Sequence, residues 1–190
     1  MTDPGFLGKL PSRGDFVDRG VDRATRLLWS DWLDETVAAW RDAIGARWPE
    51  WYLEMPIWRF AVAGGGAPIS GILMPSEDKV GREHPLVVLG TAIVDADADW
   101  DEAWFDAAIE AALAALSDGQ EPELFARRIA DLGPPPARME ANGGRWWTDG
   151  GPHVAAGDWL NPDGLPRGEA ALGLLTGAFA GSNWIAMEPA

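Results

Sequence analysis

The segment between residues 57 and 94 constrains the fold more than any other part of this sequence. Residues 57–63 (IWRFAVA) place apolar side chains at every second position and Arg59 between them, which predicts a strand with two distinct faces. Residues 69–74 are predicted to be its antiparallel partner, because the connecting GGGAP has the length and composition of a hairpin loop. Residues 86–94 (LVVLGTAIV) are apolar throughout, as is typical of a central strand covered on both faces.

Helices are predicted on both sides of this segment in the sequence. In the first helix, residues 22–44, apolar side chains recur every three or four positions, and Gly45 follows as a stop signal. The spacing of Asp99 and Glu102 resembles a capping box and predicts the start of a second helix. This second helix is predicted to end near residue 116. Two further helices are predicted over residues 121–132 and 170–179, and two further strands over residues 145–148 and 183–188.

The expected fold is a single α/β domain over residues 1–190. A chain of 190 residues and 20.5 kDa has the size of one domain with a substantial core. The order of elements predicts a mixed, partly antiparallel sheet of about five strands, flanked by helices in a layered sandwich. Most of the twelve tryptophans are expected in the core, because those at 29, 40 and 58 fall on predicted apolar faces.

Composition excludes several classes of function. The absence of cysteine excludes disulfides, iron–sulfur clusters, thiolate zinc sites and a cysteine nucleophile. A formal charge of -15 opposes binding to nucleic acid and to anionic membranes. No apolar run reaches the roughly 20 residues of a membrane span, and the first residues do not resemble a signal peptide, so a cytoplasmic location without membrane insertion is expected.

Acidic residues are concentrated in the segment 83–126, which holds eleven of them and no lysine or arginine. Five aspartates between residues 95 and 106 have the spacing of a calcium loop, but Trp100 occupies the position where that loop needs glycine. We therefore predict no metal site and no cofactor there. A solvated acidic face is favoured, and docking of a basic partner stays open.

No catalytic motif stands out, so an enzyme is not the leading hypothesis. The sequence has no G-x-S-x-G motif, and carboxylate pairs are too common in so acidic a chain to identify an active site. Two alternatives remain open: a small acidic hydrolase that uses carboxylate catalysis, and a tryptophan-based carbohydrate-binding module. The first requires convergent carboxylates in a pocket with perturbed ionisation, and the second requires exposed coplanar indoles.

Two charged loops are the candidate binding surface. Residues 8–17 (GKLPSRGDFV) and 74–86 (MPSEDKVGREHPL) each combine both charge signs with proline and glycine, which predicts loops of fixed shape. We expect them to lie close together, with Arg13 or Arg82 meeting Asp15 or Asp78. The same charges could instead satisfy the loop backbone. The candidate partner-binding residues are Arg13, Asp15, Ser76, Asp78 and Arg82.

The sequence resembles the TagF/ImpM family, accessory proteins of the bacterial type VI secretion system. The resemblance rests on GFLGKLPSRGDFV at 5–17, WSDWL at 29–33, PIWRF at 56–60 and GILMPSEDKVGREHPL at 71–86, with GRWWTDG at 144–150 as a later match. It implies a cytoplasmic, non-enzymatic regulator that restrains the secretion apparatus after translation, by binding a type VI component such as a forkhead-associated scaffold protein. Glu77, Glu83 and His84 depart from residues that are more often apolar or aromatic in the family.

Overall fold

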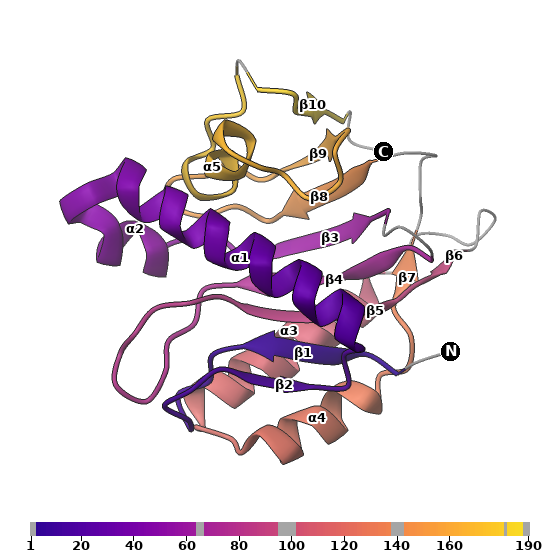
Figure 1. Cartoon of the computed structure of the whole chain (residues 1–190). Coiled ribbons are helices and arrows are strands. Elements are labelled where there is room, and N and C mark those ends of the chain that lie inside the picture. The colour runs from indigo at the N-terminus through magenta and orange to yellow at the C-terminus, as the bar shows by residue number, and fades with distance from the viewer. Residues whose placement is uncertain (1–2, 64–66, 95–101, 138–142, 181, 188–190) are drawn as a thin grey trace.

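An antiparallel sheet of eight strands forms the centre of the molecule, and helices cover both of its faces (Figure 1). The structure is a computed structural model that describes residues 3–63, 67–94, 102–137, 143–180 and 182–187. The strands lie in the order β10-β9-β8-β3-β4-β5-β1-β2, and each neighbouring pair is antiparallel. They are β1 (Gly5–Gly8), β2 (Val17–Arg19), β3 (Trp58–Val62), β4 (Ile69–Met74), β5 (Leu86–Thr91), β8 (Gly144–Thr148), β9 (Gly157–Asn161) and β10 (Ile185–Ala186).

One face of the sheet packs against the long helix α1 (Arg23–Ile44), with α2 (Trp48–Leu53) and α5 (Glu169–Thr176) beside it (Figure 1). The carboxylate of Asp22 caps α1 by accepting hydrogen bonds from the backbone N–H groups of Ala24 and Thr25. A short 3₁₀ turn, Gly45–Arg47, connects α1 to α2. The predicted core tryptophans are confirmed, because Trp29, Trp40 and Trp58 are all fully buried in this layer.

The opposite face packs against α3 (Ala103–Ser117) and α4 (Pro122–Ala130). Because side chains alternate along β3, Arg59 lies on this face while its neighbour Trp58 packs in the α1 layer. Phe105 and Phe125 are the largest side chains that the two helices bury. A separate parallel pair, β6 (Ile93–Val94) and β7 (Pro136–Ala137), lies outside the main sheet.

The prediction of about five strands is wrong, because the main sheet has eight. The hairpin of β3 and β4, the buried strand β5 and strand β8 are confirmed. The additional strands are short and include glycine and aspartate, which are depleted in strands, so their sequences indicate loops. The prediction of a mixed sheet is wrong as well: all neighbouring strands of the main sheet are antiparallel, and the parallel pair that the described residues contain, β6 and β7, belongs to a separate sheet.

The predicted helices are confirmed with shifted ends, and α2 was not predicted. Helix α3 begins at Ala103, and Asp99 lies outside the described residues together with most of the aspartate-rich segment 95–106. No helix in the described ranges has the length and apolar character needed to cross a bilayer.

The pairing of β1 with β5 brings the two charged loops together. Leu7 lies opposite Val87, so the end of β1 is beside the start of β5, and both loops leave the sheet there. Gly8 makes this close approach possible: its φ is +134°, and a Cβ at this position would lie 2.2 Å from the carbonyl oxygen of Pro85.

Candidate functional site

The second charged loop, residues 75–85, is held in shape by the buried carboxylate of Asp78. Its Oδ1 accepts hydrogen bonds from the backbone N–H groups of Val80 and Arg82, each at 3.0 Å. The backbone N–H of Asp78 donates to the carbonyl of Arg82, and Gly81, with φ +76°, donates back to the carbonyl of Asp78. The loop therefore forms a tight turn built around one aspartate.

The first charged loop, residues 9–16, is bonded directly to the second. Lys9 Nζ lies 3.1 Å from Asp78 Oδ2, and the Arg82 Nε lies 2.7 Å from the same oxygen. The Arg82 guanidinium also donates to the carbonyl of Gly14, and the Lys79 backbone N–H donates to the carbonyl of Arg13. The expectation that the loops lie together is confirmed, and so is the expected contact of Arg82 with Asp78, although both of these residues belong to the second loop. The charge pair that joins the two loops is Lys9–Asp78, which was not predicted.

Asp78 is ionised because of these contacts. Burial opposes its negative charge, but the hydrogen bonds from the Arg82 backbone, Lys9, the Val80 backbone and the Arg82 guanidinium outweigh that effect. Together they hold the pKa of Asp78 well below its usual range. The side chain of Asp78 is fully buried and that of Lys9 is 8% exposed, so this is an internal ion pair that fixes the loops.

Ser76 has a similar internal role. Its hydroxyl donates to the carbonyl of Lys9 at 2.7 Å, and its backbone N–H and carbonyl are both bonded to the Tyr52 hydroxyl. Burial raises the pKa of Tyr52, so the phenol stays protonated and donates to the Ser76 carbonyl. Ser76 and Asp78 are therefore beneath the surface that sequence reasoning assigned to them.

The other three predicted residues, Arg13, Asp15 and Arg82, are exposed. Arg13 does not meet Asp15 or Asp78: its guanidinium lies 2.5 Å from Glu121, just before α4. The neighbouring Ser12 hydroxyl also reaches this segment, through the carbonyl of Gln120. The first loop is therefore tied both to the second loop and to the connection between α3 and α4.

Two apolar side chains complete what we call the two-loop surface, formed by residues 9–16 and 75–85. Phe16 is 58% exposed and Val80 is 71% exposed. Sequence reasoning considered only the charged residues of the loops and missed both, because nothing local distinguishes an exposed Phe or Val from a buried one. Their exposure follows from the turn around Asp78 and from the contact between loops.

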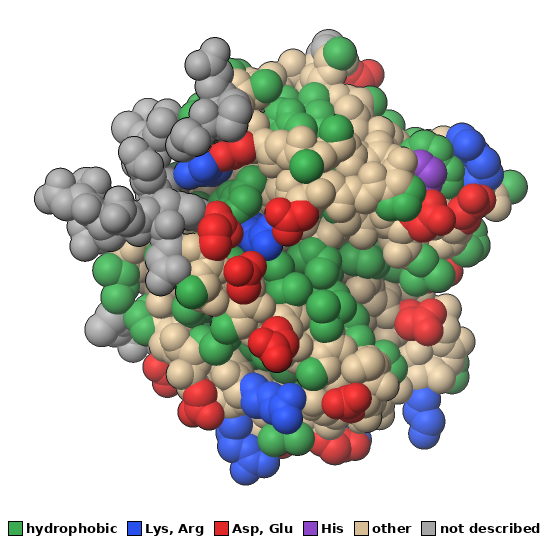
Figure 2. Space-filling view, turned by 180° about the vertical axis from the view of Figure 1, so that it is seen from behind, with side chains coloured by type: hydrophobic (Ala, Val, Ile, Leu, Met, Phe, Trp, Pro, Cys, Tyr) green, Lys and Arg blue, Asp and Glu red, His purple; other side chains and the backbone are tan. Residues whose placement is uncertain are grey.

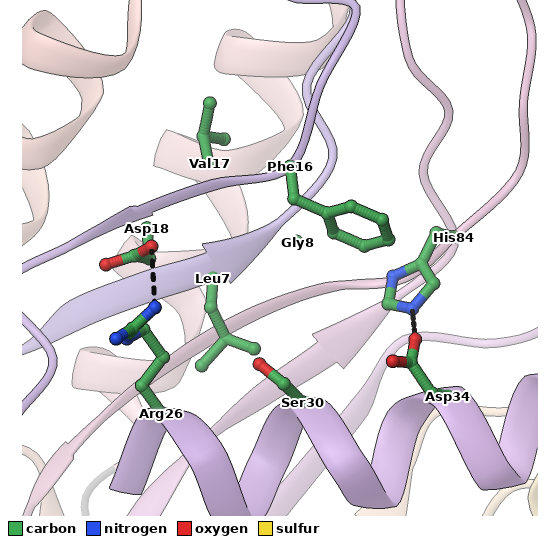
Figure 3. A pocket seen from close by; sticks show the side chains of 9 residues that line it. All are labelled: Leu7, Gly8, Phe16, Val17, Asp18, Arg26, Ser30, Asp34 and His84. Atoms are coloured by element: carbon green, nitrogen blue, oxygen red, sulfur yellow. Dashed lines mark hydrogen bonds and ion pairs between the residues drawn. The ribbon is translucent and has the colours of Figure 1, made fainter. Parts of the chain in front are cut away.

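A cavity of about 220 Å³ lies between the two-loop surface and α1 (Figure 3). Figure 3 shows Ser30 and Asp34 on α1, with the rings of Phe16 and His84 across from them. The Phe16 ring meets His84 edge-on, with centroids 4.5 Å apart. The cavity is lined by Leu7, Gly8, Phe16, Val17, Asp18, Arg26, Ser30, Asp34 and His84. A wider hollow of about 580 Å³ shares Phe16, Asp34 and His84 and extends to Arg41 and Arg82.

His84 connects the second loop to α1. Its Nε2 lies 3.3 Å from Asp34 Oδ1, and its Nδ1 lies 3.2 Å from the carbonyl oxygen of Pro85. Burial lowers the pKa of His84, and this effect outweighs the Pro85 carbonyl and the Asp34 carboxylate, which both favour the protonated ring. The imidazole in this cavity is therefore neutral at pH 7.

The carboxyl groups of the described residues show no sign of a general acid. The carboxyl groups whose pKa values shift, Asp22, Asp78 and Glu123, all shift downward, whereas a general acid needs a raised pKa. Among the residues that the structure describes, no three or more histidine, aspartate or glutamate side chains lie together as metal ligands would. Of the eleven tryptophans described, none is exposed, so they offer no platform of coplanar indoles for a sugar.

Comparison with known proteins identifies a single family. No curated protein matches the chain significantly. The crystal structure of PA0076 from Pseudomonas aeruginosa PAO1 is similar over 98% of this chain and 99% of that one, with 31% sequence identity and a TM-score of 0.80. The model of the TagF N-terminal domain family, described as type VI secretion system-associated, matches residues 5–132. Both charged loops fall within this match, which covers well over half of the sequence, and the chain belongs to the TagF N-terminal domain family of type VI secretion-associated proteins.

Proposed function

We propose that this protein is a cytoplasmic regulator that restrains type VI secretion after translation, by binding a component of the apparatus through the two-loop surface. The family association supports the link to type VI secretion. The observation that carries the binding role is that each of the two loops exposes one apolar side chain, Phe16 in the first and Val80 in the second. The second loop also exposes Arg82, which is hydrogen-bonded to the first loop.

This arrangement has the properties of a protein-binding surface. Binding energy in interfaces is concentrated in a few apolar, aromatic and arginine side chains surrounded by polar groups. The internal Lys9–Asp78 pair and the Asp78 turn hold these side chains in place before a partner arrives. The loops are therefore already ordered in the folded protein, and their ordering does not reduce the free energy of binding.

The local charge also distinguishes this surface from the rest of the molecule. The two loops carry four basic residues, Lys9, Arg13, Lys79 and Arg82, and four acidic ones, Asp15, Glu77, Asp78 and Glu83. In a chain with a formal charge of -15, a balanced region lets a partner approach without net repulsion. The partner we propose is the forkhead-associated scaffold protein of the secretion system.

The test compares binding of two charge-introducing variants to the purified scaffold protein by calorimetry. Val80→Asp on the two-loop surface is expected to weaken binding at least about tenfold, because a buried charge would replace an apolar contact. Ile185→Asp is the matched control: Ile185 is also β-branched and 52% exposed, but lies on β10 at the opposite edge of the sheet. In cells, deletion of the protein is expected to raise secretion.

Melting temperatures separate binding from folding. Both positions are exposed, so both variants should melt within a few degrees of the parent. Equal binding by the two variants would place the interface elsewhere. Unchanged secretion in the deletion strain, together with no binding of the scaffold by the parent protein, would overturn the proposed function as a whole.

A further inference from the structure

A second surface feature lies on the α3 face of the sheet, where a groove of about 660 Å³ runs between α3 and the ends of β3 and β8. Along α3 it is lined by Asp106, Ile109, Glu110, Leu113, Ala114 and Ser117. These positions recur every three or four residues and so form one continuous face of the helix, about 16 Å long at 1.5 Å per residue.

The groove has an apolar floor. Leu113 is 47% exposed, and Ile109 and Ile57 are partly exposed beside it. The opposite wall is fixed by Thr148, whose hydroxyl donates to the Ile57 carbonyl at 2.7 Å and accepts from the Gly150 backbone N–H at 3.1 Å. The groove is therefore a formed depression and not a gap between mobile segments.

The rim of the groove is acidic. Asp106 and Asp149 both contact the guanidinium of Arg59, at 3.1 and 2.9 Å, and Glu110 lies on the same helix face as Asp106. The Arg59 side chain is 8% exposed, whereas those of Asp106 and Asp149 are 63% and 87% exposed. The single positive charge is thus buried, and three carboxylates border the groove in solvent. Figure 2 shows this side of the molecule, with acidic side chains gathered at the edge of an apolar area.

We infer that this groove is a docking site for a basic amphipathic helix of a partner protein. The apolar face of such a helix would cover Leu113 and Ile109, and its lysine or arginine side chains would meet Asp106, Glu110 and Asp149. Helices that dock in grooves are recognised in this way, by apolar anchors at helical spacing with complementary charges at the rim.

Charge decides between a basic partner and a second copy of this chain. A copy would bring its own formal charge of -15 to an already acidic rim, which opposes self-association through this face. An acidic partner is disfavoured for the same reason. A cationic segment instead gains attraction from the rim and covers the exposed apolar floor.

The experiment uses the whole 190-residue chain and a fluorescent peptide of about 14 residues, four helical turns, built only from leucine and lysine in an amphipathic pattern. Anisotropy titrations are compared for two pairs of variants. Glu110→Lys is matched by Asp31→Lys on α1, which changes the net charge equally. Leu113→Ser is matched by Leu27→Ser on α1, because both leucines are 47% exposed.

We expect Glu110→Lys and Leu113→Ser each to weaken peptide binding at least about tenfold, while the α1 variants bind like the parent. Methyl NMR of the parent should show peptide-induced shifts at Ile57, Ile109 and Leu113. Equal losses in the groove and α1 variants would reveal general attraction to an acidic protein and overturn the site. Equally tight binding of a peptide with glutamate in place of lysine, or dimers abolished by Leu113→Ser, would also overturn it.

Discussion

Asp78 illustrates how a residue's chemistry can be identified from sequence while its role is not. A short charged loop with Asp, Gly and Arg predicts a fixed shape, and Asp78 does fix it, through two backbone hydrogen bonds and two cations. Burial of the carboxylate could not be predicted, because it depends on Lys9, which is 69 residues away in the sequence. The exposed members of the candidate site are instead Arg13, Asp15 and Arg82, with Phe16 and Val80 added by the structure.

His84 gives the protein a pH-dependent stability. Its folded pKa is lowered, so as pH falls below about 6.5 the unfolded chain takes up a proton that the folded chain does not. The contribution of His84 to the free energy of unfolding is therefore fully present above this pH. It falls as the pH drops through the window between the unfolded and the folded pKa, and it does not change further below that window. Urea unfolding at several pH values between about 5 and 8 measures this change.

His84→Gln isolates the contribution of this residue, because glutamine does not titrate. Acidification should lower the unfolding free energy of the parent more than that of the variant. The value for the parent minus the value for the variant should therefore fall as the pH is lowered. A difference that stays constant across the pH range would show that His84 is protonated equally in the folded and unfolded chains.

At the scale of elements, long periodic segments were predictable and short strands were not. Helix α1 and the β3–β4 hairpin carry strong local patterns, and both are confirmed. Strand β1 (GFLG) has glycine at both ends and becomes a strand through pairing with the distant β5, and the three-residue β2 then pairs with β1 at the edge of the sheet. The pairing of β1 with β5 places the two loops side by side. Because no local sequence pattern shows which distant strands pair, the proximity of the loops could only be stated as a hypothesis from the sequence.

Gly8 is the position at which this pairing is most sensitive to substitution. An alanine there would have to adopt φ near +134° and place its Cβ against the backbone of Pro85, so one strand end must move. Gly8→Ala is expected to lower the unfolding free energy by at least about 2 kcal/mol. Gly14→Ala in the same loop is the control, since no atom lies within 4 Å of its added Cβ. Equal stability of the two variants in urea would contradict the close approach of β1 and β5.

At the scale of the whole molecule, the sheet extends beyond the part of the chain that the family match covers. That match ends at residue 132, but β8 pairs with β3 in the middle of the sheet. Three fully buried tryptophans also link the part of the chain before residue 132 to the part after it. The indole N–H groups of Trp32, Trp40 and Trp58 donate to the backbone carbonyls of Pro166, Ala171 and Leu174, respectively. Residues after 132 therefore satisfy polar groups in the core of residues before it.

We propose that residues 1–190 fold as one cooperative domain, and that a fragment ending at residue 132 does not fold. Without β8 and α5, the fragment would expose one edge of β3 and open the core around Trp32, Trp40 and Trp58 to water, and each large apolar side chain that loses its burial costs about 1.5–3 kcal/mol. Losses of this size approach the total stability of a typical domain. The full chain should unfold in urea in one transition that coincides by tryptophan fluorescence and circular dichroism, whereas the fragment should show no cooperative transition. A fragment with dispersed amide NMR signals and a sharp transition would instead establish residues 1–132 as a domain in their own right, with the later strands added to a fold that is already complete.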